Sequence, residues 1–206
     1  MIYFLKGFTL GIAYVAPIGV QNLFAINTSL TQSKKRAYIT AFIIMFFDIT
    51  LSVACFLGAG AIMSASKWLE LIVMGMGSLV VMYIGFSIIR SEANLDASTN
   101  VDMPIAKVLT TACVVTWFNP QALIDGTLLL GASKATTPQN FGYIFMLGVC
   151  SASALWWFGL TTAITLFKSK ITPKIFKFIN IVCGAFIIFY GGSLLYDFIK
   201  LAKTVF

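Results

Sequence analysis

Long stretches without charged residues are the feature that most limits how this chain can fold. Of its 206 residues, 59% are hydrophobic and only 10% are charged, whereas about 25% of a soluble domain is charged. Six stretches hold no charge or a single aspartate, and they cover residues 7–33, 37–66, 71–89, 108–133, 135–167 and 178–196. A transmembrane helix needs about 20 apolar residues. The pattern therefore predicts an all-α membrane protein rather than a soluble bundle of buried helices.

Six transmembrane helices fit this pattern, and we expect them at residues 3–30, 37–64, 68–90, 104–131, 139–167 and 173–200. Little sequence is left for a soluble part, so we predict one transmembrane domain over residues 1–206. The polar, acidic linker 91–103 divides it into residues 1–90 and residues 104–206, with three helices in each.

Prolines interrupt the first and the fourth predicted helix. Pro17 lies in the segment APIGVQN, and Pro120 lies in the segment NPQALID. A proline inside a helix removes a backbone hydrogen bond, and unpaired backbone groups are tolerated in a membrane only where they line a cavity or meet a partner. A matched pair of interrupted helices in two halves is typical of a transporter binding site. We therefore expect Pro17, Gly19 and Pro120 to act as hinges.

The two groups of three helices resemble each other. Residues 77–85 align with residues 184–192, with Gly77, Tyr83 and Gly85 identical, and Pro17 aligns with Pro120 at a similar offset. Three is an odd number, so the second group enters the membrane in the opposite direction. The sequence thus predicts two inverted-topology repeats. The alternative is a chance similarity between glycine-rich helices.

Two aspartates lie deep inside predicted helices. Asp48 is near the middle of the second helix, and Asp125 follows Pro120 by five residues. An acid inside a membrane is by default a functional candidate that faces the interior of the bundle. Without a basic partner at the same depth, each can bind a proton or a cationic substrate. The alternative is a protonated side chain that donates to a neighbouring backbone carbonyl.

Amides flank both prolines, and they suit the backbone of an amino acid because an amide both donates and accepts hydrogen bonds. The predicted substrate-binding residues are Gln21, Asn22, Asp48, Asn119, Asp125 and Trp156. Trp156 could contact a cation through its ring face, although plain packing explains it equally well. The amides could instead simply join helices to one another.

The basic residues lie at the ends of the predicted helices. Counted by side, nine of them fall near residues 34, 98 and 171, and five fall on the side of the two termini. The positive-inside rule then puts those three loops in the cytoplasm and both termini outside. The net charge of +7 is explained in this way without a nucleic-acid partner.

The chain contains no histidine, and its cysteines have no metal-ligand spacing. We therefore predict no cofactor and no metal site. The lack of histidine, of cysteine pairs and of a phosphate-binding loop also argues against a membrane-embedded enzyme.

These motifs, in this order, resemble those of the LysE-type amino-acid exporters, specifically the lysine/arginine branch. The family's first-helix motif Pro-x-Gly-Pro-Gln-Asn is similar to residues 17–22, except that Val20 replaces its second proline. Its fourth-helix motif, Thr-Trp-x-Asn-Pro with an acid five residues on, is similar to residues 116–125. Its acid in the second helix matches Asp48, and a serine before a Trp-Phe stretch resembles residues 153–158.

The resemblance implies secondary active export of L-lysine or L-arginine across the bacterial inner membrane, coupled to a proton gradient or to the membrane potential. The direction of transport comes from the resemblance alone. The expected partners are the amino acid, protons and the lipid bilayer, and the glycine-lined helices permit a homodimer. Export of neutral amino acids or metal cations by the same fold, a membrane-embedded enzyme and a passive channel are the alternatives.

Overall fold

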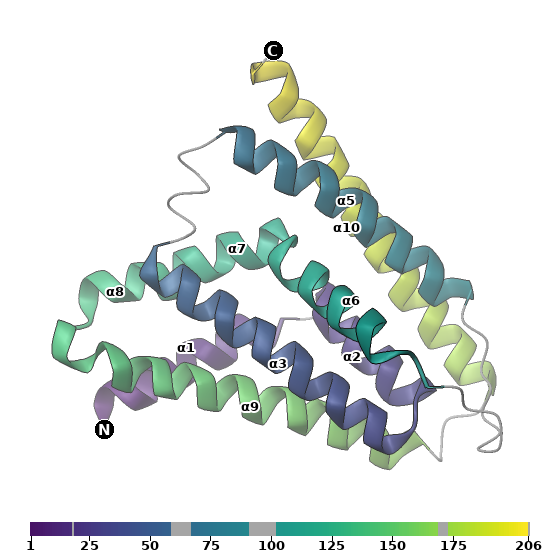
Figure 1. Ribbon diagram of the computed structural model, residues 1–206, viewed down its shortest axis with the longest axis horizontal. Helices are drawn as coiled ribbons and strands as arrows, with labels where there is room; N and C mark the ends of the chain where they lie inside the picture. Colours follow the sequence, from purple (N-terminus) through teal and green to yellow (C-terminus); the bar gives the residue numbers. More distant parts are fainter. Residues whose placement is uncertain (18, 59–66, 91–101, 169–172, 206) are drawn as a thin grey trace.

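The computed structural model describes residues 1–17, 19–58, 67–90, 102–168 and 173–205 (Figure 1). Every regular element within these ranges is helical. The elements are α1 (Ile2–Val15), α2 (Val20–Thr31), α3 (Lys34–Leu57), α5 (Lys67–Arg90), α6 (Ile105–Trp117), α7 (Pro120–Gly126), the π-helix η1 (Thr127–Gly131), α8 (Ala132–Thr136), the 3-10 turn η2 (Gln139–Phe141), α9 (Gly142–Phe167) and α10 (Pro173–Val205).

The helix α3 has well-defined ends. The Ser33 hydroxyl caps its first turn by accepting from the Arg36 N–H, and Gly58 ends it in the left-handed conformation with a φ of 106°, which favours glycine. These two signals make the helix begin and end earlier than the predicted range 37–64. Its 24 residues span about 36 Å, enough to cross a bilayer core of about 30 Å.

Two helical segments among the described residues are long and apolar enough to cross a membrane. They are α3 and the segment Gln139–Phe167, and α1 with α2 passes the same test as one span bent by 76°. Shorter apolar helices run over Met74–Arg90 and Ile105–Trp117. The model thus agrees with an all-α membrane protein, whereas the six spans and the inverted repeat stay predictions.

Glycines bring two pairs of helices into close contact. The helix α1 lies along α9. A Cβ on Gly7 would sit 2.0 Å from the Phe145 carbonyl oxygen, and a Cβ on Gly148 would sit 2.2 Å from the Phe4 carbonyl oxygen. Likewise α5 lies along α10, where Cβ atoms on Gly85 and Gly184 would sit 2.9 and 2.7 Å from each other's carbonyl oxygens. Both pairs join the first half of the chain to the second.

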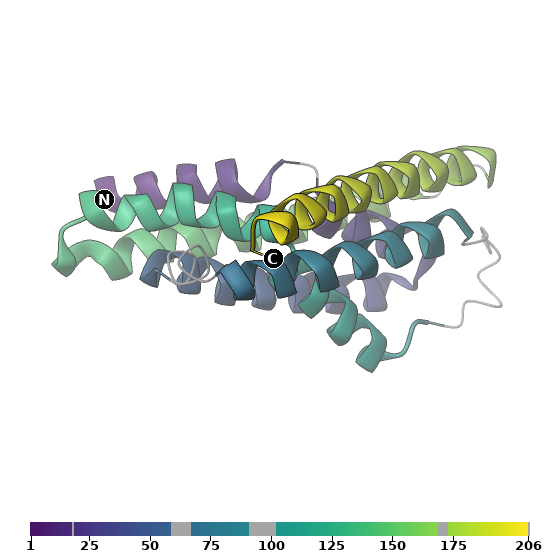
Figure 2. The same cartoon turned by 90° about the horizontal axis from the view of Figure 1, so that it is seen from above.

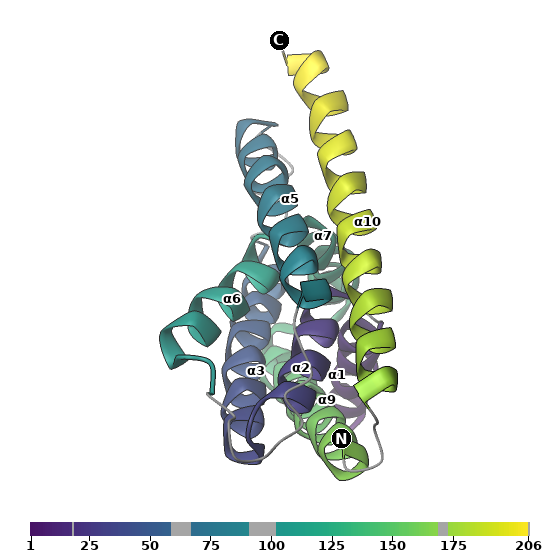
Figure 3. The same ribbon diagram turned by 90° about the vertical axis from the view of Figure 1, so that its right-hand side faces the viewer.

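The α5–α10 pair slants across one side of the molecule (Figure 1), and the C-terminal end of α10 extends beyond the other helices (Figure 3). Large apolar side chains on this pair are exposed, among them Leu79, Tyr83, Phe178, Phe189 and Tyr196. Seen from above, the helices lie in a flat, elongated arrangement (Figure 2). A buried core lies among them and includes Val20, Ile44, Val108, Val115 and Trp157.

Candidate functional site

The first candidate feature is the break between α1 and α2. The helix α1 ends at Val15, and α2 begins at Val20 with extended Gly19 at its N-terminal cap. The Asn22 amide donates from Nδ2 to the carbonyl oxygens of Pro17 at 2.9 Å and Val15 at 3.3 Å. The last carbonyls of a helix lack partners within it, so Asn22 supplies these bonds and fixes the shape of the break. Ile18 lies outside the described residues.

Trp156 approaches the same break from α9. Its indole Nε1 donates to Asn22 Oδ1 at 2.8 Å. Both donors and one acceptor lone pair of Asn22 are therefore used within the protein, which leaves one lone pair for a ligand. The indole N–H of Trp156 is also occupied, so a ligand cation would meet this residue at its ring face.

The second break separates α6 from α7. The helix α6 ends at Trp117, and Pro120 is the first residue of α7, a position where a missing N–H costs no hydrogen bond. Asn119 is buried, and its backbone carbonyl accepts from the Leu123 N–H to begin α7. Gln21 connects the two breaks, because its Nε2 donates to the Thr116 hydroxyl on α6 at 2.7 Å.

Asp48 lies where α3 packs against α9. The side chain is only 1% exposed, and its Oδ2 accepts a hydrogen bond from the Ser153 hydroxyl at 2.5 Å. The indole N–H of Trp157 lies beside the same carboxylate, but the geometry falls short of a hydrogen bond. The partner of this buried acid is thus a serine rather than a basic side chain.

Asp125 is half-buried near the end of α7. Immediately after it, Gly126 packs so tightly that a Cβ there would lie 2.8 Å from Cys55 Sγ on α3. The chain then continues as the π-helix η1, and π-helical turns are frequent at functional sites. Asp125 therefore stands where one helical geometry changes to another.

Tyr14 is a further candidate site residue, which sequence reasoning missed. Its hydroxyl donates to the Ala122 carbonyl at 3.4 Å, and it lies within electrostatic range of both Asp48 and Asp125. Tyr14 therefore connects the end of α1 to the neighbourhood of the two acids. The only signal in the sequence was its position one turn before Pro17.

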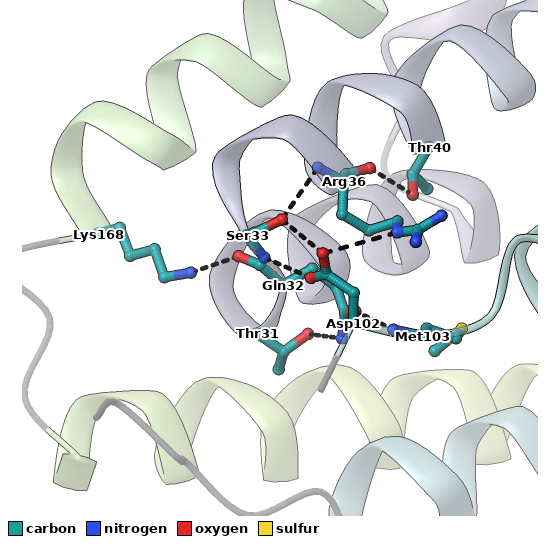
Figure 4. Close-up of polar contacts among 8 residues, drawn as sticks. All are labelled: Thr31, Gln32, Ser33, Arg36, Thr40, Asp102, Met103 and Lys168. Atoms are coloured by element: carbon teal, nitrogen blue, oxygen red, sulfur yellow. Dashed lines mark hydrogen bonds and ion pairs between the residues drawn. The ribbon is translucent and has the colours of Figure 1, made fainter. Parts of the chain in front are cut away.

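A polar cluster lies at one end of this bundle (Figure 4). The Asp102 carboxylate accepts from the Ser33 N–H at 2.8 Å and the Ser33 hydroxyl at 2.7 Å, and Arg36 Nε lies 3.8 Å from Asp102 Oδ2. Lys168 Nζ donates to the Gln32 carbonyl at 2.7 Å. We call these five residues the Asp102 cluster. It joins the α2–α3 turn to the residues before α6 and to the end of α9.

The charges in this cluster influence one another. Burial raises the pKa of Asp102, and the two hydrogen bonds from Ser33 lower it. The positive charges of Arg36 and Lys168 act in the same direction, so the pKa of Asp102 lies below its ordinary value. Burial lowers the pKa of Lys168, and the charge of Asp102 opposes this.

Contacts at the opposite end are fewer among the described residues. Lys6 Nζ donates to the Thr136 hydroxyl at 2.9 Å, and Lys134 Nζ donates to the Leu57 carbonyl at 3.4 Å. Both contacts are exposed. Within the described ranges, no group of three acidic, histidine or cysteine side chains could hold a metal ion.

Comparison with known proteins decides the family. The model of the LysE type translocator family matches residues 12–198. The chain belongs to the LysE family. It is therefore a membrane transporter and not an enzyme.

Similar LysE-family proteins include three bacterial proteins named arginine exporter protein ArgO. The protein of Klebsiella pneumoniae (strain 342) is 32% identical over 202 residues, which cover 93% of this chain and 92% of the relative. The protein of Salmonella paratyphi A (strain ATCC 9150 / SARB42) is 31% identical, with 88% of each chain covered. The protein of Escherichia coli (strain K12) is 29% identical, and the match covers 99% of this chain and 98% of the relative. No solved structure gives a significant match.

Proposed function

We propose that this LysE-family protein exports a basic amino acid, L-arginine or L-lysine, across the bacterial inner membrane as a secondary transporter. The relatives named arginine exporters are similar over nearly their whole length. The observation that carries the proposal is Asp48, a carboxylate buried between α3 and α9 that is held by a serine and not by a basic side chain. A buried acid of this kind suits the binding of a cation or a proton that arrives from outside the chain.

The proposed binding site lies between the two breaks. Asp48 and Asp125 take the cationic side chain or the coupled proton, and Tyr14 lies within electrostatic range of both. Gln21, Asn22 and Asn119 hold the α-amino and α-carboxyl groups, and the ring face of Trp156 contacts the cation. The breaks around Pro17, Gly19 and Pro120 serve as hinges for alternating access.

The proposed architecture is a pair of inverted repeats, residues 1–90 and 104–206, within one transmembrane domain of six spans. The pattern of helix contacts supports it. In the first set of contacts α1 and α2 pack on α9, in the second α6 and α7 pack on α3, and α5 and α10 pack on each other. A two-fold axis between the repeats would exchange the first set with the second and α5 with α10. The homodimer that the glycine-lined helices permit stays a prediction.

We propose that the end with the Asp102 cluster faces the cytoplasm, with both termini outside. It is supported by the larger number of basic residues at this end. In this orientation the contacts of Asp102 with Ser33 and Arg36 join the segments at the cytoplasmic end. Loading of the substrate for export would then require the contacts of Asp102 with Ser33 and Arg36 to open.

Counterflow with purified protein in liposomes tests the function. Vesicles loaded with unlabelled arginine should accumulate labelled arginine, and lysine should compete, whereas leucine and threonine should not. Saturable counterflow would exclude a passive channel, and counterflow with leucine but not arginine would contradict the proposed substrate class.

Variants of the two acids test the site. We expect Asp48→Asn and Asp125→Asn each to lower arginine counterflow by at least about tenfold, because a lost bond to a charged group costs about 1.5–3 kcal/mol. Glu92→Gln makes the same chemical change in the linker and should keep full activity. Thermal unfolding would show that the inactive variants remain folded. Full activity in both aspartate variants would overturn the assignment of these residues.

A further inference from the structure

Asp48 and its hydrogen-bond partner Ser153 hold the same place in the two proposed repeats. The two proline breaks lie 103 residues apart, and the aligned segments 77–85 and 184–192 lie 107 residues apart. The helices α3 and α9 come between the break and the aligned segment in each repeat, so equivalent residues in them should be 103 to 107 positions apart. Asp48 and Ser153 are 105 positions apart, in the middle of this range.

The contacts between α3 and α9 show where equivalent residues meet. Hydrogen-bonded partners are 124 positions apart at Tyr38 and Thr162 and 105 positions apart at Asp48 and Ser153, so the two helices run antiparallel. Two antiparallel helices that are related by a two-fold axis cross that axis where a residue faces its own equivalent. For α3 and α9 this point is the contact of Asp48 with Ser153, and an offset of 103 or 107 would move it by only one residue.

The helix pair of α5 and α10 meets in the same way. A Cβ on Gly85 would lie 2.9 Å from the Gly184 carbonyl oxygen, and a Cβ on Gly191 would lie 2.6 Å from Met82 Cγ. These two contacts join residues that are 99 and 109 positions apart, on either side of the 107-residue offset of these helices. Both helix pairs therefore cross where equivalent residues face each other, as a single two-fold axis requires.

The chemistry of a position on the axis explains why the two equivalents differ. Asp48 and Ser153 are 1% and 2% exposed, and Asp48 Oδ2 accepts from the Ser153 hydroxyl at 2.5 Å. Two carboxylates at such a distance cannot both stay ionised, whereas a hydroxyl can donate to one carboxylate. A residue that faces its own equivalent can therefore be an acid in one repeat only, and the other repeat supplies its hydrogen-bond donor.

We infer that the cation-binding acid of this transporter lies on the pseudo-two-fold axis, and that Ser153 is its positioning residue and can exchange places with it. The inference rests on the proposed function and on the proposed repeats. Alternating access moves one repeat against the other around a fixed site. Contacts away from the axis, such as those of Asp102, change in this motion, whereas a contact on the axis is kept. Asp48 therefore meets the cation in both states, and the carboxyl group can be carried by either helix.

Exchanging the two side chains tests this inference in the full chain, purified and reconstituted in liposomes. Asp48→Ser alone should lower arginine counterflow by at least about tenfold, because it removes the carboxyl group that binds the cation. The double variant Asp48→Ser with Ser153→Asp returns the carboxyl group to the axis from α9 and gives it a serine donor on α3. We expect this exchange variant to recover most of the lost counterflow.

Asp48→Ser with Ser52→Asp is the matched control. It makes the same two chemical changes, and Ser52 is as deeply buried as Ser153, with 0% and 2% of the side chains exposed. The Ser52 hydroxyl has no hydrogen-bond partner among the described residues, so replacing it breaks no bond there. Its carboxyl group would lie one helical turn from the axis, about 6 Å along α3. Counterflow should therefore stay as low as with Asp48→Ser alone.

Thermal unfolding in detergent shows which variants are folded. If the exchange variant is not, Ser153→Ala reads the positioning role without moving the acid: it should raise the KM for arginine several-fold, and Ser153→Thr, which keeps the hydroxyl, should restore it. A folded exchange variant no more active than Asp48→Ser would overturn the inference, as would recovery in the Ser52→Asp control or a wild-type KM in Ser153→Ala. Absence of arginine counterflow in the wild type would instead overturn the proposed function.

Discussion

Asn22 holds the break between α1 and α2 through its hydrogen bonds to Val15 and Pro17. Asn22→Asp keeps the acceptor for Trp156 but replaces the donor to Val15 and Pro17 with a carboxylate oxygen facing two carbonyls. Leaving a buried polar group unsatisfied costs about 1–3 kcal/mol, so thermal unfolding should occur several degrees lower. Asn140→Asp makes the same change at an exposed residue of η2 and should have no effect. Equal unfolding temperatures for the two variants would show that Asn22 does not hold the break.

The sequence indicated these site residues but not their partners. Asp48, Asn22 and Gln21 could be singled out because polar side chains are costly inside apolar helices. The contact between Asn22 and Trp156 joins residues 134 positions apart, so it depends on how α2 packs against α9. Local pattern carries no information about such a contact. The same holds for Tyr14, which a pattern cannot distinguish from other aromatic side chains near a helix end.

At the level of helices, the α1–α9 contact depends on glycine. A Cβ on Gly148 would lie 2.2 Å from the Phe4 carbonyl oxygen, whereas a Cβ on Gly159, also on α9, would meet nothing within 4 Å. We expect Gly148→Ala to destabilise the protein by about 1–3 kcal/mol, as overpacking does. Gly159→Ala should be neutral or slightly stabilising, because alanine is the better helix former. Thermal unfolding in detergent measures both, and a Gly148→Ala variant as stable as Gly159→Ala would contradict the close packing.

Strong local signals mark two helix ends, of which only one was predicted. Pro120, the predicted break, stands at the start of α7, whereas Gly58 ends α3 with a positive φ inside the predicted range 37–64. The π-helix η1 has no comparable signal, since its sequence TLLLG fits an α-helix equally well. The π-helix directly follows Gly126, which packs tightly against Cys55, and local sequence does not reveal such a tertiary contact. The boundaries of α3 were predicted too late because the apolar pattern was given more weight than the Ser33 cap.

At the scale of the whole molecule, the Asp102 cluster joins segments from both halves of the chain, and its hydrogen bonds predict a specific dependence on pH. The pKa of Asp102 is lower in the folded protein than in the unfolded chain, where it is about 3.9. Asp102 therefore adds stability above that value, and this contribution disappears as the pH falls through the lowered folded pKa.

Because the side chain is partly exposed, the contribution is about 1 kcal/mol or less, or about 2–4 °C in Tm for a chain of this size. Asp102→Asn should thus unfold slightly earlier than the wild type at pH 7, and the two curves should converge as the pH falls through the lowered folded pKa of Asp102. A difference that stays the same throughout an acid titration would mean that the Asp102 charge contributes nothing to the stability of this end of the bundle.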